Sequence, residues 1–352
     1  MAKVLSLFSG SLASRVATRL VALHPQVECV QLLHFRSPFS RESDDLRQLV
    51  RTEWSRTVFR TQSIKKDYRR LVATSTDGEY SLAQSCLNCQ SLLLGKAVRY
   101  MERIGADYLV TGELPGTRGA DAPESARMAE TWGVSDRILR PLCYPQHLDD
   151  GSDLNVWANP RARSSKRLSD PAVLAELADS VGISSADPLG ACRRCKLRTP
   201  GFGERVASLF GEAGFTLNAL RLLDFDLFYK VGTDTKIVLA RNETEKRDLQ
   251  NLFLPQDLRV YPSTPHGPMT LVRTNWQQRL PAERAAVVEL AARITATHVG
   301  AGRATTIPVY YRLEMEDETQ LLNSMPFVSP EEIGRLDGIE MIPLRAAEPA
   351  VV

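Results

Sequence analysis

The sequence has no apolar run long enough to cross a bilayer. About 20 apolar residues are needed, and Arg15 and Arg19 interrupt the first candidate stretch. The first residues also lack the basic region, the longer apolar region and the small-residue cleavage site of a secretory signal. We therefore expect a cytoplasmic protein with no membrane partner.

The chain also lacks a large net charge, since 44 Lys and Arg against 42 Asp and Glu leave only +2. The whole molecule is therefore not a polycation, but basic residues gather locally at 161–167 and 192–198. Such clusters bind phosphate backbones or form ordinary solvated surface, and both readings stay open. The candidate RNA-binding residues in them are Arg161, Arg163, Lys166, Arg167, Arg193 and Arg194.

Histidine is scarce: the 5 His residues never stand four apart, so a histidine metal site is not expected. Cysteine is the better candidate, because 4 of the 6 Cys residues form two C-x-x-C pairs. Disulfides are rare in a reducing cytoplasm, so these pairs predict a metal or cluster site, with a dithiol redox pair as the alternative. Cys29 and Cys143 have no near partner and are expected to be buried.

Apolar runs and helical periodicities alternate along the first part of the chain. Strands are predicted at 4–8, 27–35, 57–64 and 107–113, and helices near 12–23, 42–55 and 93–104. Strand, helix and strand within about 35 residues is the βαβ unit of parallel sheets. This order predicts an α/β fold, a doubly wound parallel sheet, over residues 1–145.

The rest of the chain does not continue this alternation of parallel strands and helices. Residues 146–200 read as a linker and a cysteine-bearing segment, which includes a short helix at 171–181. Two strands, a turn and a helix capped by Asn242 predict a small α+β domain at 201–262. A helix at 281–297 and further strands predict a second small α+β domain at 263–352.

The segment Ser9-Gly10-Ser11 lies between the first strand and the first helix. Free N–H groups and the helix dipole make such a helix start favourable for an anion. Neither the P-loop nor the Rossmann fingerprint is present. A phosphate site and a simple serine N-cap are therefore both open from spacing alone.

Several segments, in order, resemble one family. "SGSLAS" resembles the SGGxDS signature of the PP-loop, or N-type, ATP pyrophosphatases. "LLHFRSPF", "CLNCQSLLLGKAVRYMERIGADYLVTGE" and "DPLGACRRC…TPGF" resemble the branch of tRNA 4-thiouridine and 2-thiouridine synthetases. "YKVGTDTKIVLARNETEKRDL" resembles an NFACT-R-like domain found in RNA-quality-control factors.

The resemblance implies an adenine nucleotide alpha hydrolase (HUP) fold that uses ATP with Mg²⁺ to adenylate a tRNA uridine before sulfur replaces the oxygen. The tRNA is the implied partner, whereas the sulfur donor and the oligomeric state stay open. The residues that would bind the nucleotide are Ser9, Gly10, Ser11, Ser14, His34, Phe35, Thr111, Gly112 and Glu113.

The cysteines fit the same resemblance. Cys86, Cys89 and Cys192 match three cysteines that in some relatives ligate a [4Fe–4S] cluster, so they are the implied catalytic residues. Cys195 adds a fourth thiol, and four thiolates also suit a structural Zn²⁺. Cluster and zinc therefore both remain as predictions.

The phosphate loop departs from the family at two positions. Ser11 replaces the second glycine of the signature, and Ala13 replaces its acidic residue. The lost carboxylate would help with magnesium and phosphate. This favours an alternative, in which the chain is a non-catalytic RNA-binding paralogue with a degenerate loop and a structural zinc or Fe–S site.

Overall fold

The structure is a computed structural model that describes residues 1–40, 45–64, 67, 71–74, 80–114, 122–143, 170–185, 195–209, 216–299 and 306–344. They divide into two compact units, Met1–Thr199 and Pro200–Ala346, each built on its own main sheet. Within the described residues, no helix has the length and hydropathy of a membrane span.

The first unit is built on a parallel sheet, as the sequence predicts. Its described strands stand in the order β3-β2-β1-β6-β7, and every neighbouring pair is parallel. The chain runs from β1 outwards to β3 and then crosses to β6 and β7 on the other side. The order therefore reverses between β1 and β6. The strands are β1 (Ala2–Leu7), β2 (Val27–Arg36), β3 (Val58–Ser63), β6 (Tyr108–Val110) and β7 (Ile138–Leu139).

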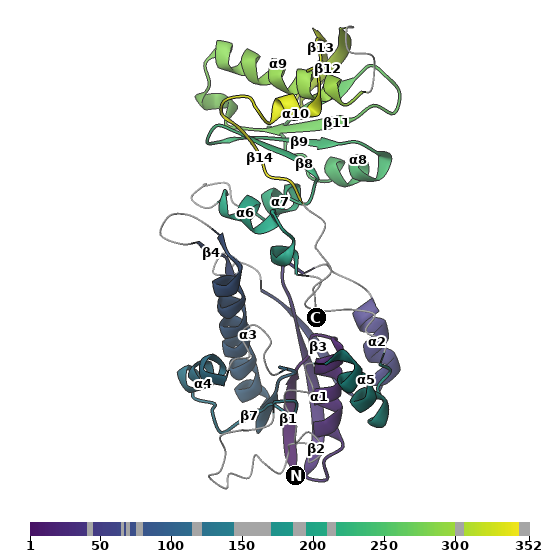
Figure 1. Ribbon diagram of the computed structural model, residues 1–352, viewed down its shortest axis with the longest axis vertical. Coiled ribbons are helices and arrows are strands. Elements are labelled where there is room, and N and C mark those ends of the chain that lie inside the picture. Colours follow the sequence, from purple (N-terminus) through teal and green to yellow (C-terminus); the bar gives the residue numbers. More distant parts are fainter. Residues whose placement is uncertain are drawn as a thin grey trace. The chain divides into compact units, whose positions relative to one another are not determined.

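Helices cover both faces of this sheet (Figure 1). On one face, α1 (Leu12–Ala22), α2 (Asp45–Glu53) and α5 (Pro171–Ser180) enclose an apolar core that includes Phe8, Val16 and Trp54. On the other face lie α3 (Leu82–Ile104) and α4 (Ala122–Thr131). A small hairpin, β4 (Ala73–Thr74) with β5 (Tyr80–Ser81), precedes α3.

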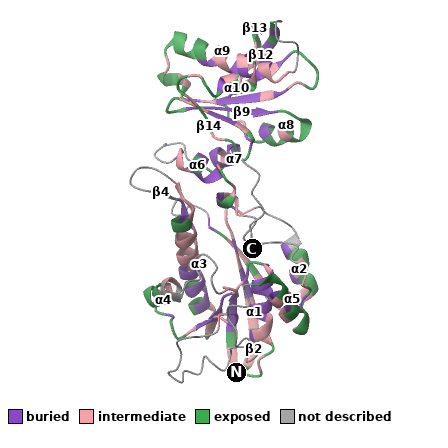
Figure 2. Ribbon diagram, in the orientation of Figure 1, coloured by how far each residue is buried: buried purple, intermediate pink, exposed green. Residues whose placement is uncertain are grey.

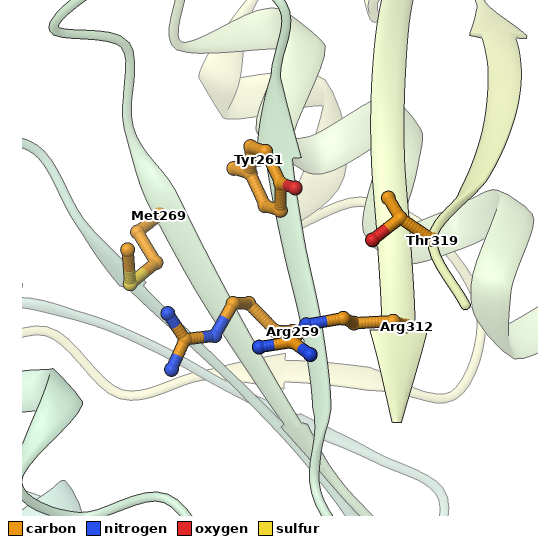
Figure 3. Close-up of a pocket in the computed structure, with 5 residues that line it drawn as sticks. All are labelled: Arg259, Tyr261, Met269, Arg312 and Thr319. Carbon is orange, nitrogen blue, oxygen red and sulfur yellow. The ribbon is translucent and has the colours of Figure 1, made fainter. Parts of the chain in front are cut away.

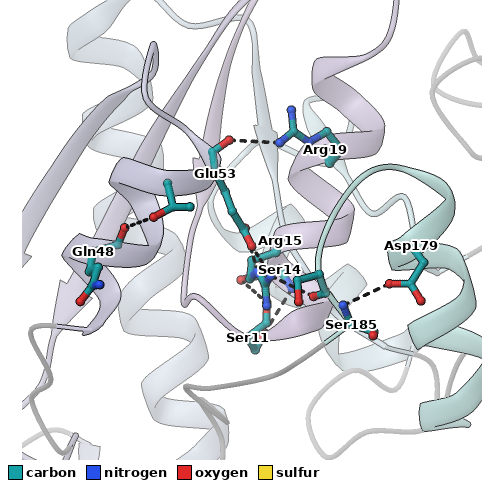
Figure 4. A network of polar contacts seen from close by, with 10 residues as sticks. Ser11, Ser14, Arg15, Arg19, Gln48, Glu53, Asp179 and Ser185 are labelled. Atoms are coloured by element: carbon teal, nitrogen blue, oxygen red, sulfur yellow. Dashed lines mark hydrogen bonds and ion pairs between the residues drawn. The ribbon is translucent and has the colours of Figure 1, made fainter.

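A buried arginine joins the three helices on the first face (Figure 4). Arg15 on α1 is 1% exposed and forms an ion pair with Glu53 at the end of α2. Its guanidinium also donates to the carbonyl oxygen of Ser184, 2.9 Å away and just beyond α5. Because a buried charge without partners is costly, this contact fixes how the helices meet.

Helix α3 begins earlier than the sequence analysis expects. The sequence predicts this helix near 93–104, but Ser81 caps a helix that starts at Leu82. The Ser81 hydroxyl accepts a hydrogen bond from the backbone N–H of Gln84 at 3.3 Å. Cys86 and Cys89 therefore lie within the first two turns of α3, not at a junction between loop and helix.

The second unit is built on an antiparallel sheet whose described strands stand in the order β13-β12-β10-β11-β9-β8-β14. The strands in the middle of this sheet are mostly buried (Figure 2). The strands are β8 (Leu227–Val231), β9 (Thr235–Ala240), β10 (Leu258–Pro262), β11 (Met269–Arg273), β12 (Ile307–Leu313), β13 (Gln320–Ser324) and β14 (Ile339–Met341). The helical segments are η5 (Lys196–Arg198) at the end of the first unit and α6 (Phe202–Ala207), α7 (Leu217–Leu222), α8 (Glu243–Gln250), η6 (Trp276–Gln278), α9 (Pro281–Thr297) and α10 (Pro330–Ile333) in the second.

One core lies between this sheet and α9 and α10, with Val260, Val309 and Ala291 fully buried in it. The boundary that the sequence analysis places at residue 262 falls inside the sheet, because β10 pairs with β11 directly across it. Strands from both proposed small domains therefore share one hydrogen-bonded ladder. The predicted cap is present: the side chain of Asn242 accepts from the Glu245 N–H at the start of α8.

A second buried arginine connects several segments of this unit by hydrogen bonds. Arg205 on α6 is fully buried and donates to the carbonyl oxygens of Leu223, Phe225, Asp226 and Ile342 at 2.5–2.9 Å. Burial lowers the pKa of its guanidinium to about 10. One side chain therefore joins α6, the approach to β8 and the segment after β14.

Candidate nucleotide-binding edge and cysteine site

The candidate nucleotide site lies at the carboxyl edge of the parallel sheet, where the strand order reverses. The loop after β1 carries Ser9, Gly10 and Ser11, and the loop after the neighbouring β6 carries Thr111, Gly112 and Glu113. Ligands of open α/β sheets bind outside the carboxyl ends of the strands at such a reversal. The two segments proposed from sequence as nucleotide-binding therefore meet at the position where the fold favours a ligand.

The loop after β1 is held by its own serine side chains. Gly10 has a φ of 83°, a left-handed conformation that favours glycine. The N–H of Gly10 donates to Ser14 Oγ at 3.1 Å, and the Ser14 N–H donates to Ser11 Oγ at 3.3 Å. The hydroxyls of Ser9 and Ser11 share a 3.0 Å hydrogen bond. The N–H groups of Gly10 and Ser14, which could otherwise bind an anion, therefore donate to serine oxygens. This is the arrangement expected of a serine N-cap.

The helix start keeps features of an anion site as well. Leu12 and Ala13 occupy the first two helical positions, so their N–H groups have no acceptor inside α1. The macrodipole of the helix also favours negative charge there. Ala13 itself is 8% exposed and belongs to the apolar core below the loop. The position at which the related signature has a carboxylate is therefore a packing position in this chain.

The loop after β6 contributes a close approach and an unused hydroxyl. A Cβ on Gly112 would lie 2.4 Å from the Cα of Ser14, so the backbone of this loop touches the first turn of α1. Thr111 is 5% exposed, and among the described residues its Oγ1 has no hydrogen-bond partner. An unpaired buried hydroxyl costs about 1–3 kcal/mol. A polar ligand at this edge would satisfy it.

The two candidate residues at the end of β2 differ in environment. The His34 Nδ1 lies 3.0 Å from the carbonyl oxygen of Phe8, and burial lowers the pKa of the imidazole below its usual value. His34 is therefore neutral at pH 7. Phe35 is 7% exposed and packs inside the unit. Their role in binding adenine stays a prediction.

Sequence reasoning missed two residues at the same edge. The Glu113 carboxylate forms an ion pair with Arg140, which follows β7, with the Arg140 Nε 3.0 Å from the Glu113 Oε2. The Cys143 Sγ donates to the carbonyl oxygen of Glu113 at 3.2 Å, and burial raises the pKa of this thiol to about 12. A signal was available, since Arg140 directly follows the short apolar strand Ile138–Leu139, whose carboxyl end lies at this edge.

The structure places three of the four candidate metal-binding cysteines on neighbouring segments. Cys86 and Cys89 are partly exposed and stand three residues apart, so they share one face of α3. The segment of Cys195 is held close to the start of this helix, because the Tyr80 hydroxyl donates to the Leu197 carbonyl oxygen at 3.1 Å. The Lys196 N–H also donates to the Phe39 carbonyl oxygen at 2.6 Å, just beyond β2. Three partly exposed thiols thus belong to neighbouring segments.

The remaining candidates lie outside the described residues. Within the described part of the chain, no three Cys, His, Asp or Glu side chains are close enough to hold a metal ion. Cys29 is exposed, so the expectation of burial is wrong for it. The candidates outside the described residues are Cys192, Arg161, Arg163, Lys166, Arg167, Arg193 and Arg194.

Comparison with curated proteins gives no match in sequence. Solved structures give weak likenesses. The U34-tRNA thiolase NcsA from Methanococcus maripaludis, with its [4Fe-4S] cluster, is 14% identical over 63% of this chain and 73% of its own, with a TM-score of 0.28. A predicted subunit of tRNA methyltransferase from Methanocaldococcus jannaschii is 10% identical over 52% and 90%, with a TM-score of 0.29. The C-terminal part of the fibronectin/fibrinogen-binding protein from Streptococcus suis is 10% identical over 68% and 95%, with a TM-score of 0.25. TM-scores this low carry no functional argument.

A family model matches the second unit. The match covers residues 229–335, which extend from β8 to just past α10, and so runs well beyond the segment 201–262 that the sequence analysis expected. It includes both sides of the β10–β11 pair, in agreement with a single sheet. The second unit of this chain carries a segment that matches the NFACT protein RNA binding domain.

Proposed function

We propose that this protein is an ATP-dependent tRNA sulfur transferase-like protein. The observation that carries the proposal is the match of residues 229–335 to the NFACT protein RNA binding domain, in the same chain as a doubly wound sheet with a candidate ligand edge. In this proposal the second unit binds RNA and the first unit binds the nucleotide that activates it. The PP-loop resemblance of "SGSLAS" supplies the reaction class.

Observations at the sheet edge support nucleotide binding. The Thr111 hydroxyl lacks a hydrogen-bond partner among the described residues. Gly112, which has no side chain, lets the backbone after β6 approach the backbone of Ser14 closely. The N–H groups of Leu12 and Ala13 would face a phosphate. His34, neutral at pH 7, would lie beside the adenine end.

The proposed reaction has two steps. The uridine oxygen displaces pyrophosphate from ATP and becomes adenylated, and sulfur then replaces that oxygen with loss of AMP. Cys86, Cys89 and Cys192, with Cys195 as a fourth thiol, would hold a cluster or a zinc ion. A cluster with one open iron would present sulfide, whereas zinc on four thiolates would only stabilise the fold.

Two observations favour the second candidate, a non-catalytic RNA-binding paralogue. Ala13 is part of the apolar core and offers no carboxylate for magnesium. The hydroxyls of Ser11 and Ser14 also use loop N–H groups that a phosphate would need. In this candidate the loop is a serine cap and the cysteines have a structural role.

The experiment measures pyrophosphate release from ATP and Mg²⁺ with unmodified tRNA, using anaerobically purified full-length protein, together with RNA affinity in the same buffer. RNA-dependent release supports sulfur-transferase chemistry. RNA binding without release selects the second candidate, and absence of RNA binding overturns both.

The metal content gives a second criterion. Metal analysis and absorption spectra of the wild-type protein separate an iron–sulfur cluster from zinc. Cys86→Ala removes one proposed ligand and should abolish bound metal. Cys29→Ala is the matched control, because Cys29 is exposed on β2 and belongs to neither pair. Equal metal content in both variants would contradict the cysteine site.

A further inference from the structure

The described residues of the second unit form a hollow on the sheet whose chemistry is unfavourable for RNA. It has a volume of about 250 Å³ and is lined by Arg259, Tyr261, Met269, Arg312 and Thr319 on the sheet (Figure 3). Arg259 donates two hydrogen bonds of 2.9 Å to Glu314, which neutralises its charge. The neighbouring turn carries the exposed Glu316, Asp317 and Glu318, which would repel phosphate.

A second hollow is a groove between α9 and the edge strand β13, with a volume of about 730 Å³. Ligand pockets of roughly 300–1,000 Å³ are typical, so the groove has room for a nucleotide. Val288 on α9 and Leu322 on β13 are half-buried in its wall and also pack on the core. The groove therefore offers apolar surface to the flat face of a base.

The rim of the groove is basic. Arg284 and Arg293 on α9 line it, with Glu289 as its one acidic lining residue, and neither arginine forms an ion pair within the described chain. The Arg293 guanidinium lies 3.9 Å from the centre of the Phe327 ring. This contact fixes a planar cation at the groove, and an arginine fork suits a phosphate group. In contrast to Arg259, both charges are available to phosphate.

A buried polar atom lines the same groove. Ser324 at the end of β13 is 3% exposed, and in the described part of the structure its Oγ has no hydrogen-bond partner. A hydroxyl buried without a partner is unfavourable. The edge of a nucleobase in the groove would supply the missing partner, which an apolar protein side chain would not.

We propose that this groove binds one unpaired nucleotide of a single-stranded RNA segment. The base lies against Val288 and Leu322 with its edge towards Ser324, and the adjoining phosphates contact Arg284 and Arg293. The inference rests on the proposed RNA binding of residues 229–335 and adds the place of contact and the preference for unpaired RNA.

The test uses the full chain and a fluorescent single-stranded RNA of mixed sequence, with affinity measured across a salt series. Each phosphate contact to single-stranded RNA contributes about 0.7 to the slope of log K against log salt, which corresponds to about a fivefold affinity at 0.1 M salt. Arg284→Gln should therefore lower the affinity about fivefold and reduce the slope by about 0.7. Arg247→Gln, the same change at an exposed position on α8, should leave both unchanged.

Photo-crosslinking supplies a second readout that does not depend on charge. RNA that contains 4-thiouridine should crosslink to peptides that include residues 284–293 or 320–325, and a duplex of the same sequence should compete poorly. If the wild type binds RNA but Arg284→Gln matches Arg247→Gln, or the crosslinks fall elsewhere, the groove is not the site. If the wild type does not bind RNA, the proposed function itself fails.

Discussion

Replacing Gly112 with alanine tests whether the loops after β1 and β6 form one site. The added Cβ would lie 2.4 Å from the Cα and 2.7 Å from the backbone nitrogen of Ser14. Ordinary contacts begin at 3.4 Å, so the loop after β6 and the first turn of α1 must separate by about 1 Å, at the overpacking cost of about 1–3 kcal/mol. Since the clashing atoms are backbone, no side-chain rotation relieves the contact.

The expected result is a less stable first unit and weaker nucleotide binding. For a unit of this size, about 2–4 °C of melting temperature is lost per kcal/mol. A 1 Å displacement at a binding loop can cost up to about a hundredfold, so we expect at least a tenfold loss of affinity for ATP. Differential scanning fluorimetry and calorimetric titration measure the two effects.

The matched control is Gly334→Ala. Gly334 has a negative φ of −71°, and its added Cβ would lie 3.8 Å from the nearest heavy atom, the carbonyl oxygen of Glu331. The same chemical change should then shift stability by no more than about 0.5 kcal/mol. An unchanged melting temperature for Gly112→Ala would refute the close packing of the loop after β6 on the first turn of α1, whatever the nucleotide result.

Three further outcomes are expected. Arg205→Met leaves four carbonyl oxygens without their donor, two of them in buried hydrogen bonds, and should cost about 2–6 kcal/mol in urea unfolding of the second unit, whereas a loss below 1 kcal/mol would contradict the carbonyl contacts. Cys143 is only partly buried, but with the pKa of its thiol raised to about 12 it should react with iodoacetamide at pH 8 far more slowly than the exposed Cys29; equal rates by mass spectrometry would contradict the raised pKa. Because the pKa of His34 is lowered in the folded unit, the unfolded chain binds more protons below pH 6.5. The free energy of unfolding should thus fall from pH 7 to pH 5, and less steeply in His34→Gln, as melts at both pH values will show.

The first unit could be predicted well because its signals are local. Continuous apolar runs predicted β1 and β2, and helical periodicity predicted α1 between them. The edge of the sheet that carries Ser9 and Thr111 then follows from parallel topology. The start of α3 was missed because the segment "SLAQSCLNC" is polar, and only the cap contact of Ser81 distinguishes it from loop.

Long-range pairing was not accessible from the sequence. The β14 strand pairs with β8 across more than 100 residues, and β10 pairs with β11 across the expected boundary at residue 262. The exposure of Cys29 has a similar origin, since β3 pairs with β2 only from Gln31 onwards and leaves the first residues of β2 without that neighbour. Strand pairing and the exposure of strand ends depend on three-dimensional neighbours, which local sequence patterns do not identify.

The burial of Ala13 limits which residues the start of α1 can carry. The residue is buried with Leu12 and Val16 in the core of the first unit. An aspartate at this position would place a carboxylate among these apolar side chains, and a buried carboxylate without partners is strongly unfavourable. The packing of α1 therefore disfavours an acidic residue at position 13. Introducing one would require compensating changes in α1 and its neighbours, so laboratory evolution towards phosphate chemistry should find routes that supply the charge from another loop.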